Sequence, residues 1–345
     1  HPAAVENGDQ SADSIDDEQP IAGLLTTLAV PANGSVTISV ILGQANHRSQ
    51  ADAVIARLRN VAHARESLAK TRAWWNDLID TLQIKTSDPE FDGYLHWLKY
   101  QALAERIWAR KGFYQASGAF GFRDQLQDAV NLIWVDPRLA RRQVLLHAAQ
   151  QFREGDVVHW FFRLQDGRTG FALRSHASAN LLWLAWAAVD YLAMTGDRAI
   201  WDEPVPYLTA ETPLPPLPRA KDGIGFFPHR SAEEEPLFEH VLRAVDLVLD
   251  RRMGTHGLPL IGSGDWNDGL DEIGSEGRGE SVWLGLFLYT ILTRLIEHVE
   301  QKRSPPRKAH YQEKLASLHT ALERTWRDDR YLRAIHDDGT EIGIR

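Results

Sequence analysis

The chain has 345 residues, of which 43% are hydrophobic and 25% are charged, as in ordinary globular proteins. Its 47 acidic and 38 basic residues give a formal net charge of −9, which argues against nucleic-acid partners and against binding to anionic lipid. Cysteine is absent, so disulfides and thiolate metal sites are excluded. No apolar run approaches the roughly 20 residues of a membrane span, and we expect no transmembrane segment in this chain.

The first 86 residues comprise three stretches of different composition. Residues 1–20 are acidic and polar, and we predict that they are disordered or form a surface loop. Residues 21–47 contain two β-rich runs around a Pro-Ala-Asn-Gly turn at 31–34, which predicts a hairpin that forms the last strands of a sheet. Residues 48–86 have helical periodicity and are predicted to form a helical linker.

From residue 87 to 345 the pattern alternates between helices and long loops. Asp-Pro pairs at 88–89 and 136–137 mark two helix starts, and further helices are predicted at 179–194, 236–252, 281–302 and 308–328. The loops predicted between them are 110–128, 153–178, 196–235 and 254–280. Loops of this length are uncommon in a compact bundle without a function. Because several helices are apolar on more than one stripe, we predict concentric helices of a barrel. Residues 334–343 predict two short strands around a turn.

Residues 264–269, Gly-Asp-Trp-Asn-Asp-Gly, concentrate the chemistry of the chain. Carboxylates and amides can grip sugar hydroxyls, an indole face can stack on sugar C–H groups, and cleavage of an acetal needs a positioned acid. The alternative is an Asx-rich turn whose tryptophan fills the core. The stretch therefore favours a carbohydrate site but does not establish one.

Other loop residues have both a structural and a functional interpretation. Arg123 and Asp124 either form an ion-pair network at a helix start or contact substrate. His159 fits a structural histidine better than a ligand. Asn180 or Ser178 can cap the helix that follows, and Glu280 can complement a helix dipole or contact substrate. Phosphate-binding glycine loops, paired metal ligands and a nucleophile elbow are absent, so we predict carboxylate chemistry without a metal or cofactor.

Taken in order, these motifs resemble glycoside hydrolase family 94, the family of cellobiose and chitobiose phosphorylases. Within it the chain is most similar to the carboxy-terminal region of cyclic β-1,2-glucan synthases and to β-1,2-oligoglucan phosphorylases. The resemblance covers nearly the whole chain from about residue 24. It rests on the following segments: 108–115, 121–128, 154–160, 182–197, 256–260, 264–269 and 279–284.

The resemblance implies a mainly α fold, in which an (α/α)6 barrel follows the end of a β-sandwich and a helical linker. It also implies that Asp268 is the general acid, that Trp266 lines the donor-sugar site and that Arg174 is a donor-site arginine. Asp265 would position the sugar or the loop. Inorganic phosphate would be the co-substrate that attacks a β-glucan, in place of the water used by an inverting hydrolase. We expect burial beside Trp266 and the neighbouring Asp265 to favour protonated Asp268.

Two departures from the family pattern bear on activity. The family has an Asp-Asp pair where this chain has Ala179 and Asn180, so a charged grip on the donor sugar is lost. The family's phosphate-binding His and Thr-Gly pair lie beyond the region of Arg345. We therefore expect the rest of the barrel to come from a further segment or another chain, with a homodimer allowed.

Three functional readings stay open on the sequence. The first is a β-glucan phosphorylase region, acting on β-1,2 linkages, of a larger cyclic-glucan synthase on the cytoplasmic side of the inner membrane. The second is a non-catalytic glucan-binding or scaffolding region of such a synthase. The third is an inverting β-glucan hydrolase.

Overall fold

The computed structural model describes residues 26–43, 45–108, 118–164, 166–211, 213–219, 223–302 and 304–343. The chain divides into two compact units, the first ending at Asp77 and the second beginning at Leu78. The segment predicted to be disordered, 1–20, lies outside the described residues, as do residues 109–115 of the quoted motif 108–115. The domain boundaries suggested by the sequence stay predictions.

The first unit contains helix α2 (Arg48–Leu58) and most of helix α3 (Val61–Ile79). Only the turn of the predicted hairpin is present: the Gly34 N–H donates to the Pro31 carbonyl over 3.0 Å. Residues 26–43 form no strands, and Val40 and Leu42 are exposed, so the hairpin prediction is wrong for this structure. A two-stranded hairpin is marginal without a sheet or helix to cover its apolar face.

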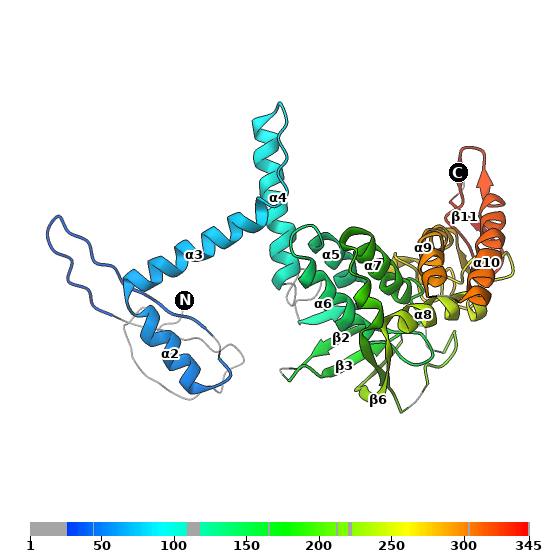
Figure 1. Ribbon diagram of the computed structural model, residues 1–345, viewed down its shortest axis with the longest axis horizontal. Helices are drawn as coiled ribbons and strands as arrows, with labels where there is room; N and C mark the ends of the chain where they lie inside the picture. The colour runs from blue at the N-terminus through cyan, green and yellow to red at the C-terminus, as the bar shows by residue number, and fades with distance from the viewer. Residues whose placement is uncertain are drawn as a thin grey trace. The chain divides into compact units, whose positions relative to one another are not determined.

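The second unit is mainly helical (Figure 1). The helix starts predicted at both Asp-Pro pairs are confirmed, and the Asp136 carboxylate accepts the Arg138 N–H at 3.0 Å. One helix was missed, because residues 122–132 were partly assigned to a loop. The helices are α4 (Pro89–Trp108), α5 (Phe122–Leu132), α6 (Pro137–Ala148), α7 (Asn180–Thr195), α8 (Leu237–Arg251), α9 (Val282–Gln301) and α10 (Pro305–Glu323).

Helix α7 lies at the centre of this helical layer. It contacts α5, α6, α8 and α9, and α10 packs along the other side of α9 (Figure 1). Because α7 has neighbours on several sides, its sequence is apolar nearly all round and most of its side chains are buried. Helix α9 is the one described helix that is long and apolar enough to cross a membrane by length and composition alone. Its buried residues, including Leu288 and Leu292, pack into this core.

The described residues also form four small sheets, and strands β1 to β6 lie in regions that were predicted as loops. The largest is antiparallel in the order β1 (Ala119–Gly121), β2 (Val158–Arg163), β3 (Thr169–Arg174), β5 (Ile224–Phe226). Its strands are short, and register shifts interrupt the pairing of β2 with β3, which weakens the alternation that would reveal them. The others are β4 (Pro204–Thr209) with β6 (His229–Pro236), β8 (Trp326–Arg327) with β9 (Arg330–Tyr331), and β7 (Glu280–Ser281), β10 (Ala334–Ile335) and β11 (Glu341–Ile342). The pair β10 and β11 confirms the two strands predicted near the end.

Candidate active site

The starts of three neighbouring helices bring the predicted site together. Arg123 in the first turn of α5 donates from Nη1 to the backbone carbonyl of Asp265 at 2.6 Å. The Ser178 N–H, just before α7, donates to the Gly264 carbonyl at 3.0 Å. Ser281, which caps α9 by accepting the Leu284 N–H, also donates to Asp265 Oδ2 at 2.5 Å. Segments far apart in the sequence are thereby tied to the loop that begins at residue 264.

Two side-chain turns shape the loop itself. Asp265 Oδ1 accepts the Asn267 N–H at 3.0 Å, and Asn267 Oδ1 accepts the Gly269 N–H at 3.0 Å. Gly264 has φ +109°, a conformation that residues with a Cβ rarely adopt. The turn-forming reading of this stretch and the functional reading are therefore compatible, because the turns present the remaining side chains outward.

Asp265 is fully buried and serves the loop. Its carboxylate accepts two hydrogen bonds from Arg333, each 2.7 Å, in addition to those from Ser281 and Asn267. Burial would raise the pKa of Asp265, but the hydrogen bonds from Arg333, Ser281 and the Asn267 backbone outweigh it and leave the pKa below its usual value. Asp265 is therefore an ionised positioning group.

Asp268 has the opposite environment. Its side chain is 60% exposed, and one carboxylate oxygen, Oδ2, accepts a hydrogen bond from Arg123 Nη2 at 2.7 Å. The expected burial of Asp268 is wrong for this structure, and Arg333 neutralises the Asp265 carboxylate that was expected to favour protonation. No hydrogen bond to Oδ1 is recorded in the described part of the chain. The carboxyl is thus held at one oxygen and open at the other.

Trp266, two residues before Asp268, has half of its surface exposed. Its Nε1–H donates to Gln127 Oε1 at 2.9 Å, and its ring centroid lies 6.4 Å from that of Trp283 on α9. Gln127 therefore orients the indole while leaving part of it accessible. An oriented, accessible indole can stack on the C–H face of a sugar.

Arg174 and Asn180 are buried behind the loop. Arg174 donates twice to Asp156, over 2.7 Å each, and its guanidinium lies 3.7 Å from the centroid of the Phe152 ring. Asn180 is the first residue of α7, and its side-chain oxygen has no hydrogen-bond partner in the described structure. Arg174 is thus occupied by protein partners, whereas Asn180 retains an unused acceptor.

Glu280 is also occupied by protein partners. Its buried carboxylate accepts the His256 N–H at 3.0 Å and the Leu258 N–H at 2.9 Å, and its Oε1 lies 2.7 Å from His256 Nδ1. A Cβ on Gly254 would lie 2.2 Å from the Glu280 carboxyl carbon, so glycine is needed there. Ser281, not Glu280, caps α9, and Glu280 shapes the turn at 254–258.

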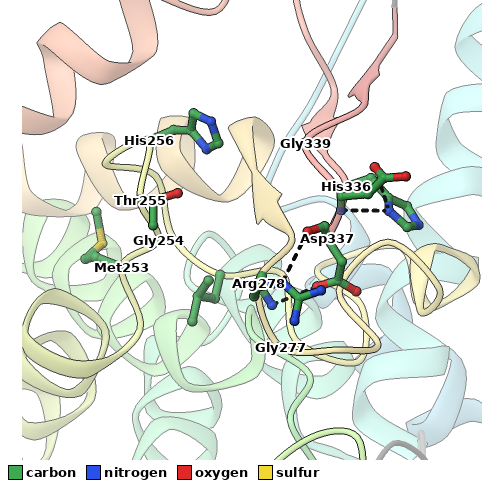
Figure 2. Close-up of a pocket in the computed structure, with 11 residues that line it drawn as sticks. Met253, Gly254, Thr255, His256, Gly277, Arg278, His336, Asp337 and Gly339 are labelled. Carbon is green, nitrogen blue, oxygen red and sulfur yellow. Dashed lines mark hydrogen bonds and ion pairs between the residues drawn. The ribbon is translucent and has the colours of Figure 1, made fainter.

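The turn shaped by Glu280 forms one wall of a pocket of about 540 Å³ (Figure 2). Arg278 and Asp337 lie on the opposite wall, and the Asp337 carboxylate accepts the backbone N–H groups of Glu276, Arg278 and Gly279. Asp268, Trp266 and Arg123 do not line this pocket. It is therefore a separate feature from the loop described above.

His159 and Asp124 complete the charged surroundings of Asp268. His159 Nδ1 lies 2.8 Å from Ser175 Oγ. Burial lowers the pKa of His159, while the charges of Asp268 and Asp124 oppose the shift and that of Arg123 adds to it. Asp124 is exposed at the start of α5. His159 was interpreted from the sequence as a structural group. Nothing in the sequence indicated that the charge of Asp268 acts on His159.

Two further residues of the site were missed. Gln127 belongs to a quoted motif but received no role, and Arg333 lies in a region to which no function was assigned. Arg333 reaches Asp265 across 68 residues of sequence. Residues paired over such a separation form no recognisable sequence pattern, so the pair can be identified only from the structure.

The sequence of the chain is similar to those of known proteins over nearly its whole length. Residues 74–214 and 221–345 match the catalytic domain of the glycosyl hydrolase 94 superfamily. The chain is 39% identical to the cyclic beta-(1,2)-glucan synthase NdvB of Rhizobium meliloti, over 99% of this chain and 12% of that protein. It is 26% identical to a 3-O-beta-D-glucopyranosyl-beta-D-glucuronide phosphorylase and 28% identical to a solabiose phosphorylase, both of Paenibacillus borealis. These matches cover 99% of this chain and 41% and 40% of the two phosphorylases, so the chain spans less than half of each relative. The chain belongs to the glycosyl hydrolase 94 superfamily, within its catalytic domain.

Proposed function

We propose that this chain is the acid-bearing part of an inverting glycoside phosphorylase that acts on β-glucans, with β-1,2-linked glucan as the substrate. One observation carries the proposal: helix α5 holds one carboxyl oxygen of Asp268 through Arg123 and orients the accessible indole of Trp266 through Gln127, which leaves the other oxygen of Asp268 open. The β-1,2 linkage is supported by the similarity to a cyclic beta-(1,2)-glucan synthase. Arg174, Asn180, Asp124 and Glu280 would act around the sugar, directly or by positioning the loops.

The chemistry needs only one protein carboxyl. Protonated Asp268 gives its proton to the glycosidic oxygen as the C1–O bond breaks, and a phosphate oxygen attacks C1 from the opposite face. The products are a glucan shortened by one unit and α-glucose 1-phosphate, since the β configuration is inverted. A sugar stacked on Trp266 would displace water from the exposed Asp268 carboxyl.

The wider architecture is part of the same proposal. Neighbouring α5, α7 and α9 would form the inner ring of an (α/α)6 barrel, and α6, α8 and α10 the outer ring. The remaining helices and the groups that hold phosphate would come from further chain or from a second protomer. The short coverage of the relatives motivates this part of the proposal.

The test is phosphate-dependent release of glucose 1-phosphate from short β-1,2-glucans by the full-length protein. We expect Asp268→Asn to reduce release at least a hundred-fold, because general-acid catalysis contributes about 10²- to 10⁴-fold. Asp329→Asn is the matched control, since Asp329 is an exposed carboxylate paired with Arg330. Equal activity of Asp268→Asn and wild type would rule out Asp268 as the acid.

Two other outcomes would replace the proposal. Release of free sugar without dependence on phosphate would identify an inverting hydrolase. Binding of glucan in calorimetry, without turnover by the full-length protein, would identify a non-catalytic glucan-binding region. The unused acceptor of Asn180, at a position where the family carries a carboxylate, is the observation that favours this second candidate.

A further inference from the structure

A second pocket, of about 340 Å³, lies behind the loop that carries Asp268. It is lined by the end of α8, the segment before α7 and residues of the 260–262 and 276–277 segments. Its polar lining groups are His176, Ser178, Arg251, Arg252 and Glu276. Asp268, Trp266 and Arg123 are not among its lining residues, so it is not the site of the proposed phosphorolysis.

Arg252 is the unusual member of this lining. Within the described parts of the chain, its guanidinium has no hydrogen bond and no ion pair, in contrast to Arg174, whose Nε and Nη2 both donate to Asp156. Burial lowers the pKa of the Arg252 guanidinium, and the charge of Arg174 adds to this effect while that of Asp156 opposes it. Arg252 is partly exposed, so its guanidinium, which has no protein partner in the described residues, is accessible to an anion that enters the pocket.

The charge and shape of the pocket select the class of ligand. Arg251, which is exposed, likewise makes no side-chain hydrogen bond or ion pair within the described residues, and Glu276 is the one acidic side chain among the lining residues. Two guanidinium groups against one carboxylate leave an excess of positive charge. The planar guanidinium fork matches oxyanions such as phosphate and can bind them through two hydrogen bonds.

We propose that this pocket binds a tetrahedral oxyanion through Arg252, either inorganic phosphate or the phosphate group of a small phosphate ester. The volume of about 340 Å³ leaves room for the organic part of an ester beside the anion. The proposal does not depend on phosphorolysis at Asp268. It concerns a separate group of residues and would hold equally if the chain only bound glucan.

The pocket is in contact with the loop through its own lining residues. The Ser178 N–H donates to the Gly264 carbonyl, and the Ser263 N–H donates to the His176 carbonyl at 3.3 Å. An anion bound to Arg252 would thus sit behind the backbone that supports Asp265 and Asp268. Occupancy of this pocket is expected to stabilise that backbone against unfolding.

The experiment measures binding of phosphate, sulfate, glucose 1-phosphate and glucose by calorimetry and thermal unfolding at constant ionic strength. We expect the three anions, but not glucose, to bind and raise the melting temperature, and Arg252→Gln to weaken anion binding at least ten-fold. Loss of the response in Arg252→Gln separates this pocket from any phosphate bound at the proposed catalytic site, because that substitution changes no residue of the catalytic site. Arg168→Gln, an exposed arginine paired with Asp166, is the matched control.

The comparison of glucose 1-phosphate with inorganic phosphate identifies the source of the anion. Tighter binding of glucose 1-phosphate than of inorganic phosphate would identify a phosphate ester as the ligand, and equal binding would identify the free anion. Equal anion responses of wild type and Arg252→Gln would overturn the proposal. So would a more stable Arg252→Met combined with no anion response in wild type, because Arg252 would then be merely an uncompensated charge.

A crystal of the wild-type protein soaked in selenate gives a readout that does not depend on any variant folding. We expect an anomalous selenium peak within hydrogen-bond distance of the Arg252 guanidinium. Absence of a peak at that position, under soaking conditions in which calorimetry detects binding, would contradict the assignment.

Discussion

Replacing Arg333 by methionine should destabilise the protein mainly through Asp265. The substitution keeps an apolar stem of similar length but removes both hydrogen bonds to a carboxylate that is fully buried. Asp265 would keep only the bonds from the Ser281 hydroxyl and the Asn267 N–H. A buried charge would then lack its counter-charge.

The expected cost follows from the geometry of the pair. Breaking a buried ion pair from one side typically costs about 3–5 kcal/mol. The Arg333 side chain is 30% exposed, and two other hydrogen bonds to Asp265 remain, so we expect a loss of roughly 2–3 kcal/mol at neutral pH.

The difference in stability between the wild type and Arg333→Met should depend on pH. In the wild type the folded-state pKa of Asp265 is lowered, so its stabilising contribution is present above the unfolded pKa, near 3.9, and is lost as pH falls through the folded value. Without Arg333, burial prevails, so the folded-state pKa of Asp265 should rise above the unfolded one and the carboxyl should protonate on acidification. The difference in stability between wild type and variant should therefore be larger at pH 7 than at pH 4.

Urea unfolding of the wild type, Arg333→Met, Asp265→Asn and the double variant at pH 7 and pH 4 measures this. The double variant should lose less free energy of unfolding than the two single variants lose together. Asp265→Asn removes the buried charge that Arg333→Met leaves without a partner. Arg330→Met is the control, since Arg330 pairs with exposed Asp329. A loss in Arg333→Met below about 0.5 kcal/mol, within the range of ordinary surface substitutions, would refute the reasoning, as would a loss that is equal at both pH values.

Three further predictions concern other buried contacts. Gly254→Ala should cost about 1–3 kcal/mol in urea unfolding, because its Cβ would meet the Glu280 carboxyl, whereas Gly93→Ala, which meets nothing within 4 Å, should not destabilise. Hydrogen bonds from Arg243, aided by Tyr207, lower the pKa of Glu235 to about 2 against the effect of burial, so its stabilising contribution should disappear between about pH 4.5 and pH 2. Glu235→Gln should lack that part of the acid unfolding slope. Burial lowers the pKa of His240 to about 4, so stability should fall as pH drops from about 6.5 to 4, where the unfolded chain binds the extra proton, and His240→Gln should flatten this slope. A slope that is unchanged in either variant would contradict the corresponding assignment.

Helices that begin with a clear start signal, such as an Asp-Pro pair, were predicted from the sequence, and α5, which has no such signal, was missed. Helix α6 begins after an Asp-Pro pair and was predicted from it. Helix α5 was missed because its first turn, containing Arg123 and Asp124, is polar and resembles a turn, although Phe122, Leu126 and Ala129 follow helical spacing and are buried. The strands β2 and β3 were missed because bulges disturb their alternation.

The site was predictable where local chemistry decides it and unpredictable where distant partners do. The loop at 264–269 drew attention through its composition, and the family resemblance distinguished its two aspartates. The structure gives them different environments, since Asp265 is buried against Arg333 and Asp268 is exposed against Arg123. The partners that occupy Arg174 and Glu280 lie 18 and 24 residues away in sequence, where no short pattern connects them.

Ser281 has a consequence for how this part of the chain can change in evolution. Its hydroxyl meets Asp265 at one end of the segment 265–281 and the first turn of α9 at the other, so the ends of the segment are joined whatever lies between them. The entropic cost of a closed loop grows only slowly with its length, by about 0.6 kcal/mol for each doubling. An insertion at exposed Glu272 should therefore be tolerated better than one at Ile273 or Gly274, which are buried. Such an insertion offers a route by which a descendant could acquire a new sugar preference while Asp268 keeps its position.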